Sequence, residues 1–139
     1  MRCLAGVLLV ALVGGCSGAG KREAASLVDA VDRYRRADAA SRESLGRGVS
    51  DVECTDARVC DARQACVAAI DPTVRALALK DEVARGIADL EQKRMAPDSP
   101  EAKALPAKLD EAERLLKDGR SKMATCDARL TDLRAAFGV

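Results

Sequence analysis

The chain has 139 residues, with 23 lysines and arginines against 22 aspartates and glutamates, and no histidine. This balance argues against a nucleic-acid-binding protein, which normally carries a basic excess. The lack of histidine removes the commonest metal ligand and the commonest general base. Tyr34 and Phe137 are the only aromatic residues. The composition is therefore more typical of a structural scaffold than of an enzyme.

An apolar segment stands at the N-terminal end of the sequence. Arg2 supplies a positive charge, residues 4–13 form an uninterrupted apolar run, and Gly14 and Gly15 are small residues of the kind that a signal peptidase needs. This pattern predicts an export signal. The run is well below the ~20 apolar residues that span a bilayer, which argues against a retained membrane helix.

Residues 13–16, Val-Gly-Gly-Cys, resemble the lipobox of bacterial lipoproteins. The resemblance implies that residues 1–15 are a signal peptide that is removed, and that Cys16 is diacylated on sulfur and anchors the chain to the membrane. Ser17, directly after the cysteine, resembles the residue found at this position in lipoproteins that enteric bacteria send to the outer membrane. The implied location is the cell envelope, on the outer membrane facing the periplasm. Secretion with cleavage elsewhere is the alternative, and it leaves Cys16 as a free thiol.

The chain without residues 1–15 fits one domain of ordinary size. Arg2 is the only charged residue removed, so equal numbers of basic and acidic residues remain and the net charge is zero. We expect residues 16–21 to be the lipidated cysteine and a flexible tether of small residues. Residues 22–139 are expected to form a helical bundle domain.

The first helix is predicted over residues 21–45, because one stripe of positions recurs there at alternating steps of three and four. Gly46 and Gly48 are expected to end it, since glycine tolerates the left-handed conformation of a helix terminus. The basic run at residues 33–36 is interpreted as a solvated helix face rather than a patch for an anionic partner. The stripe consists of Ala24, Leu27, Val31, Tyr34, Asp38, Ser41 and Leu45.

The second helix is predicted over residues 55–96, and two start signals compete for its beginning. Ser50 with Glu53 makes a capping box, whereas Thr55 followed by Asp56 makes an N-cap with an acid in the first turn. We favour the start at Thr55. Apolar residues then continue at helical spacing to the end of the range.

The third helix is predicted over residues 100–136. Residues 97–100 form the clearest turn of the sequence, with Ser99 as the N-cap and Pro100 at the first helical position. From Leu105 to Phe137 the residues of one stripe, most of them apolar, recur at alternating steps of three and four residues, which is typical of a coiled-coil seam.

Two residues inside the predicted helices lower helix propensity. Pro72 removes one backbone hydrogen bond, so the second helix either kinks there or a fresh helix begins at Pro72. Gly119 lies within the seam of the third helix, and we interpret it as a place where a neighbouring backbone comes close rather than as a ligand site.

These signals predict an all-α protein, an up-down-up three-helix bundle whose second and third helices form a long antiparallel coiled-coil hairpin. The first helix is the shortest, so it is expected to cover only the end of the hairpin that holds residues 55–79. The opposite end, residues 81–115, is expected to protrude, and we call it the hairpin tip. Because the first helix is predicted to run from its tether toward Cys54, the hairpin tip is expected to point back toward the membrane.

Once the signal peptide is removed and Cys16 is lipidated, four cysteines remain: Cys54, Cys60, Cys66 and Cys126. An exported protein allows them to form disulfides. Cys60 and Cys66 on one helix lie ~9 Å apart along its axis, which is too far for a disulfide. The distance from Cys54 to Cys66 is larger still if the chain between them is helical. The predicted pairs are therefore Cys54–Cys60 and Cys66–Cys126. Their spacing fits neither a zinc site nor a Cys-x-x-Cys redox motif.

No catalytic residue, metal or cofactor is predicted. Carboxylate pairs such as Asp110 and Glu113 are interpreted as solvated helix surface, and no nucleophile–base pair or phosphate-binding loop is visible in the sequence. The favoured hypothesis is a lipid-anchored lipoprotein with a structural or protein-interaction role, because an uncovered apolar stripe at the hairpin tip needs a protein partner or a second copy to cover it. The alternative is a periplasmic binding module for one dedicated partner, such as an inhibitor, a chaperone-like clamp or an accessory subunit.

Overall fold

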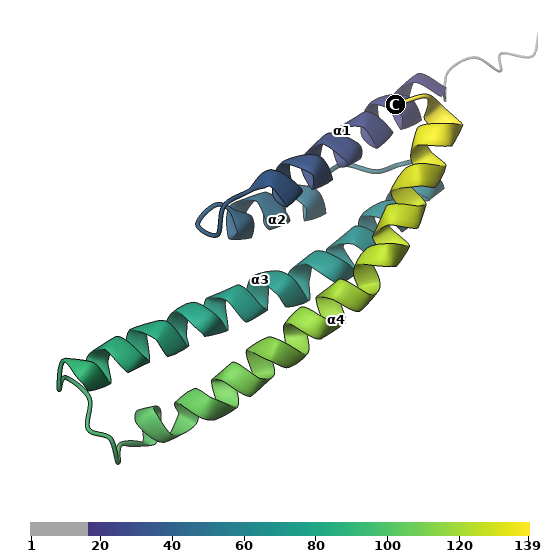
Figure 1. Ribbon diagram of the computed structural model, residues 1–139. Helices are drawn as coiled ribbons and strands as arrows, with labels where there is room; N and C mark the ends of the chain where they lie inside the picture. Colours follow the sequence, from purple (N-terminus) through teal and green to yellow (C-terminus); the bar gives the residue numbers. More distant parts are fainter. Residues whose placement is uncertain (1–16) are drawn as a thin grey trace, which may run out of the picture.

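The computed structural model describes residues 17–139, and four helices make up most of this part of the chain. α3 and α4 pack antiparallel as a long hairpin, and α1 and α2 lie over one half of it (Figure 1). The all-α class and the long antiparallel pair are confirmed, and no strand occurs among residues 17–139. The predicted signal peptide and Cys16 lie outside the described residues. The helices are α1 (Ser17–Arg36), α2 (Arg42–Ser50), α3 (Ala57–Glu91) and α4 (Pro100–Phe137).

The prediction of one helix over residues 21–45 is wrong, because this segment holds two helices and the bundle has four rather than three. A turn over residues 37–41 separates α1 from α2. In this turn the Asp38 carboxylate accepts a hydrogen bond from the backbone N–H of Ser41 at 2.8 Å. Aspartate and serine make such local bonds in competition with the helix. At its other end α1 begins at Ser17, where the sequence predicts a flexible tether.

Gly46 and Gly48 lie inside α2 instead of ending a helix. Gly46 is buried against α3, and a Cβ at this position would stand 3.1 Å from methyl carbons of Ile70 and Val74. The glycine therefore lets α2 lie close to α3. The polar turn before α2 and this contact together explain why the chain folds back here.

Asp56 is the N-cap of α3, rather than the favoured Thr55 or the alternative Ser50. Its carboxylate accepts a hydrogen bond from the backbone N–H of Arg58 at 2.9 Å. This bond satisfies one of the N–H groups that a helix leaves free at its start. Ser50 belongs to the end of α2.

α3 passes through Pro72 without ending, so the alternative of a fresh helix at Pro72 is wrong. Ile70 packs against Gly46 of α2 and Ala76 packs with Ala112 of α4, so the helix is stabilised by contacts on both sides of the proline. α3 ends at Glu91, before the predicted end at residue 96.

The start of α4 is confirmed. The Ser99 hydroxyl accepts a hydrogen bond from the backbone N–H of Ala102 at 3.1 Å, and Pro100 occupies the first helical position. The helix ends at Phe137, next to the predicted end, and Gly138 follows in the left-handed conformation with φ of 65°.

α3 and α4 meet along a seven-residue repeat of mostly small residues. At Gly119 a Cβ would stand 2.8 Å from the carbonyl oxygen of Ala69, so the predicted close approach of a neighbouring backbone is confirmed. The repeat keeps one side of each helix toward the other along the hairpin, as in a coiled coil. Its buried members are Ala62, Ala69, Ala76 and Val83 on α3, and Leu105, Ala112, Gly119, Cys126 and Leu133 on α4.

The hairpin tip points away from the start of α1, so its predicted direction is wrong. The first turn of α1 lies beside the C-terminal end of α4 and the first turn of α3, as the close contacts of Gly20 with Phe137 and Asp56 show (Figure 1). The reason is the extra reversal at residues 37–41, which turns the chain back before α3 begins. The 35 residues of α3 span about 50 Å, and this length separates the start of α1 from the hairpin tip.

Candidate interaction surface

α1 fills the groove between α3 and α4 at one end of the hairpin. Its apolar stripe, Ala24, Leu27, Val31 and Tyr34, is buried. These side chains share one hydrophobic core with residues of α2, α3 and α4. A groove between two antiparallel helices therefore accepts a third, amphipathic helix in this protein.

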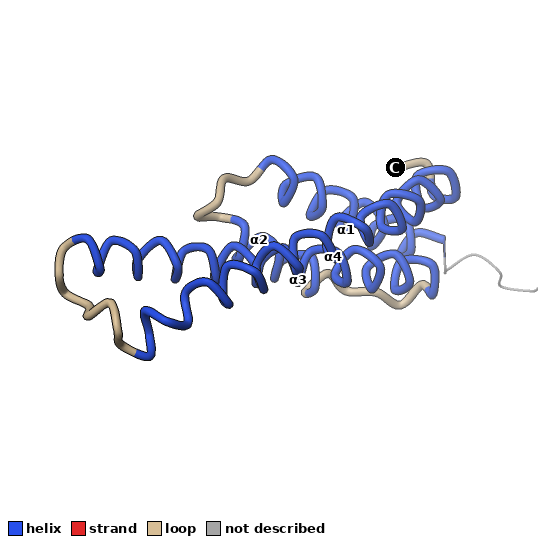
Figure 2. The backbone as a smooth tube through the Cα atoms, turned by 60° about the horizontal axis from the view of Figure 1, so that its bottom comes forward, coloured by secondary structure: helices blue, strands red, loops and turns tan. Residues whose placement is uncertain are grey.

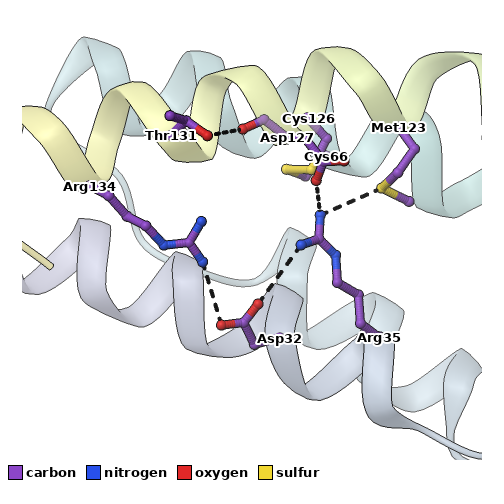
Figure 3. A network of polar contacts seen from close by, with 8 residues as sticks. All are labelled: Asp32, Arg35, Cys66, Met123, Cys126, Asp127, Thr131 and Arg134. Carbon is purple, nitrogen blue, oxygen red and sulfur yellow. Dashed lines mark hydrogen bonds and ion pairs between the residues drawn. A yellow bond between two sulfur atoms is a disulfide. The ribbon is translucent and has the colours of Figure 1, made fainter.

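A polar network also fastens α1 to α4 (Figure 3). Arg35 of α1 forms an ion pair with Asp127 of α4. Asp32 of α1 pairs with Arg134 of α4 at 3.5 Å and with Arg35 at 3.9 Å. Exposed pairs of this kind contribute ~0–1 kcal/mol each. The network therefore sets the register of α1 on α4 more than it adds stability.

The face that α1 covers continues along α4 beyond the end of α1. Leu109, Leu116, Met123 and Leu130 are spaced by seven residues. Leu130 and Met123 pack in the core that includes α1. Because the seven-residue repeat keeps each side of α4 in a constant direction along the hairpin, Leu116 and Leu109 lie on the same side of the helix, nearer the hairpin tip.

The same reasoning applies to α3. Ile87 is separated by multiples of seven from Cys66 and Val59, which are both buried in the core that includes α1. Ile87 therefore lies on the side of α3 that α1 covers farther along. The hairpin tip extends past the loop that joins α1 to α2 (Figure 2), so this part of the face has no third helix over it.

Ile87 and Leu109 are the large hydrophobic residues that remain exposed in residues 17–139, with exposed fractions of 47% and 38%. The sequence predicts an uncovered apolar stripe on the hairpin tip but does not distinguish these two residues from the other apolar positions. Their helical spacing is the same as that of buried neighbours. Only the position where α1 ends identifies them.

An ion pair joins α3 and α4 at Lys108, the residue before Leu109. The Lys108 ammonium on α4 donates a hydrogen bond to the Glu82 carboxylate on α3 at 2.7 Å. This hydrogen bond, together with the positive charge of Lys108, holds the pKa of Glu82 below its ordinary value. An ion pair therefore joins the two helices of the hairpin tip.

The four cysteines lie in two pairs, joined as the sequence predicts. Cys54 and Cys60 have their Cα atoms 5.2 Å apart, and Cys66 and Cys126 have theirs 4.5 Å apart. Cys66–Cys126 connects α3 to α4 within the core, beside the network that holds α1 (Figure 3). Cys16, the predicted lipidation site, lies outside the described residues.

Asp110 and Glu113, the carboxylate pair considered from the sequence, are exposed on α4. A groove of about 260 Å³ lies between the 37–41 turn and α3, where Arg42, Asp81 and Arg85 are among its lining residues. Within residues 17–139 no group of three side chains is arranged to hold a metal ion, and no helix is long and apolar enough to cross a membrane.

Comparisons with protein-family models, with curated proteins and with solved structures give no match for this chain. Function is therefore inferred from its own residues and their arrangement.

Proposed function

We propose that this protein is a lipid-anchored lipoprotein of the cell envelope whose helical domain holds another protein at the hairpin tip. The lipid on Cys16 anchors one end of the molecule, and the outer membrane facing the periplasm is the proposed location. Ile87 and Leu109 are the residues through which the domain binds. The protein acts by holding a partner and not by converting a substrate.

The exposure of Ile87 and Leu109 is the observation that carries this proposal. Covering these two large apolar side chains with another surface would remove apolar area from water, which is favourable. Both belong to the face that α1 covers farther along the hairpin. The proposed occupant is an amphipathic helix of another envelope protein, which extends the groove contact that α1 already makes.

The direction of the hairpin supports a partner away from the membrane. Ser17 begins α1 at the end of the molecule opposite to the hairpin tip. A lipid on Cys16 is bonded next to that end. Ile87 and Leu109 therefore lie about 50 Å farther from the lipid, which is the length of α3. A partner that lies in the periplasm fits this separation better than one that lies at the same membrane surface.

A photo-crosslinking amino acid at position 109 in the full chain, used in living cells, tests the proposal. We expect a crosslinked adduct with one other envelope protein. Ala107 is the matched control, because it is exposed on the same helix but lies about 200° around the axis from Leu109. The substitution Ile87→Glu should remove the adduct at position 109, whereas Ala107→Glu should leave it.

Three results would contradict the proposal. An adduct of equal yield at positions 107 and 109 would show that no specific surface is involved. An adduct formed only with a second copy of the chain would replace the partner helix by self-association. The absence of any adduct, with the chain folded and membrane-bound, would remove the interaction role.

A further inference from the structure

The two disulfides differ in their access to solvent. Cys66 and Cys126 are fully buried, with an exposed fraction of 0%. Cys54 and Cys60 are only half-buried, and Cys54 lies in the non-helical connection between α2 and α3. Thiol–disulfide exchange requires a thiolate to reach one sulfur of the bond. In the folded protein an external thiol therefore has better access to Cys54–Cys60 than to Cys66–Cys126.

The loop closed by Cys54–Cys60 also holds α1. The Glu23 carboxylate of α1 accepts hydrogen bonds from the backbone N–H groups of Thr55 at 2.8 Å and Asp56 at 3.1 Å. It accepts a third from the Thr55 hydroxyl at 2.6 Å. All three donors lie between the two bonded cysteines, so the disulfide limits the freedom of every group that Glu23 binds in this loop.

The ends of two other helices meet at the same place. Asp56 pairs with Arg58 at 3.1 Å, and the Arg58 guanidinium lies 4.3 Å from the centre of the Phe137 ring at the end of α4. A Cβ at Gly20 would stand 3.0 Å from that ring, so the first turn of α1 packs closely on it. The start of α1 is therefore positioned by residues within or next to the disulfide loop.

We propose that Cys54–Cys60 is a site of thiol–disulfide exchange whose oxidised form holds the first turns of α1 in place, and we call this disulfide the latch. Cys66–Cys126 is a permanent cross-link. The reductant is a dithiol, either a small molecule or a protein of the Cys-x-x-Cys class. One of its thiolates attacks a sulfur of the bond to form a mixed disulfide, and its second thiol displaces that sulfur. The dithiol is oxidised to a disulfide, and Cys54 and Cys60 take up two electrons and two protons as thiols.

Reduction returns conformational freedom to the loop, and the donors of Glu23 become mobile. The core around Cys66–Cys126 keeps the rest of the domain folded. Exchange at Cys54–Cys60 therefore loosens the end of α1 next to Cys16 without unfolding the hairpin. This latch does not depend on the function proposed for the hairpin tip.

Titration of the purified full chain with dithiothreitol tests both parts of the proposal. Thiols are trapped with N-ethylmaleimide and located by peptide mapping, and amide hydrogen exchange is followed in α1. We expect Cys54 and Cys60 to be labelled at least about tenfold faster than Cys66 and Cys126. Equal labelling rates, or faster labelling of the buried pair, would overturn the exchange site.

Selective reduction should also make amide exchange at residues 20–27 about tenfold faster, with the middle of α4 unchanged. The double variant Cys54→Ser/Cys60→Ser should show this faster exchange without reductant and should not respond to dithiothreitol. If α1 exchanges at the same rate before and after selective reduction of the wild type, the latch is overturned. This comparison needs only the wild-type chain and so stands even where the variant does not fold.

Glu23→Gln separates the latch from a general loss of stability. In the oxidised chain this variant should speed exchange in the first turns of α1, because the amide provides one acceptor oxygen for three donors. After reduction of Cys54–Cys60 it should add little, since both changes release the same contact. Additive effects of reduction and substitution would show that the disulfide loop does not act through Glu23.

Discussion

Gly119 of α4 lies directly against the backbone of α3 at Ala69. A Cβ at Gly119 would stand 2.8 Å from the Ala69 carbonyl oxygen and 2.5 Å from the hydroxyl oxygen of Thr73. The hairpin therefore depends on the absence of a side chain at this point, in the middle of its longest interface.

The substitution Gly119→Ala is expected to destabilise the protein by ~1–3 kcal/mol, because the added methyl forces the two backbones apart. Helix propensity alone predicts a gain of ~1 kcal/mol for the same change. Urea unfolding followed by circular dichroism measures the difference. Gly48→Ala on α2 is the matched control, since within residues 17–139 no atom outside its own helical backbone lies within 4 Å of its Cβ, and it should stabilise. A stabilising effect at both glycines would contradict the close approach.

Tyr34 is expected to tolerate the loss of its hydroxyl. The residue is buried, and its hydroxyl oxygen makes no well-formed hydrogen bond within the described part of the chain, although the Thr73 hydroxyl lies near it. Burial raises the pKa of this phenol, although the positive charge of Arg42 opposes the shift. Tyr34→Phe should therefore leave the free energy of unfolding unchanged or raise it by up to ~1 kcal/mol. Tyr34→Ala should lower it by ~3–5 kcal/mol, because the ring fills the core. Thermal unfolding distinguishes the two variants.

The stability of the contact between α1 and the 54–60 loop should depend on acid. The hydrogen bonds from the Thr55 hydroxyl and from the N–H groups of Thr55 and Asp56 hold the pKa of Glu23 below its ordinary value of 4.5. A lowered pKa stabilises the folded state above the unfolded value, and this stabilisation is lost as the pH falls through the folded value. Wild type and Glu23→Gln should thus differ in urea unfolding at about pH 6, and the difference should shrink as the pH falls below the ordinary value of 4.5. A difference that stays constant over this range would assign the effect to packing instead.

Cys16 is expected to carry the lipid. Metabolic labelling of growing cells with a clickable fatty acid should tag the wild-type chain, because its residues 13–16 resemble a lipobox. Cys16→Ser should not be tagged and should leave the membrane fraction. Cys3→Ser is the control, since Cys3 lies within the predicted signal peptide. Equal labelling of the wild type and Cys16→Ser would contradict lipidation at this residue.

Local signals in the sequence determined several parts of this structure. Ser99 and Pro100 start α4 because a capping hydroxyl and a ring with fixed φ act within one turn of the chain. The cysteine pairs follow from rise per residue, which keeps Cys60 and Cys66 apart on one helix and leaves each a partner elsewhere. The capping signal and the Cys54–Cys60 pair act over a few residues. Cys66–Cys126 joins residues 60 apart, and the turn at residues 97–100 is what brings the two helices that carry them together.

The tertiary structure decided the number of helices and the direction of the hairpin. The bond between Asp38 and Ser41 ends α1 early, and Gly46 allows the chain to pack back on α3 as α2. Neither polar residue breaks the three-four spacing, so the periodicity continues across the turn unchanged. This one reversal places the hairpin tip opposite to Ser17 instead of beside it.

The tertiary structure also divided one apolar pattern into two faces. On α4, Ala112 and Gly119 face α3, whereas Leu109 lies on the side that α1 covers only farther along the helix. The sequence encodes which residues share a side, because helical spacing is a local property. Whether a side is buried depends on where another helix ends. Ile87 and Leu109 are exposed because α1 stops short of them, and that is a relationship between segments far apart in the chain.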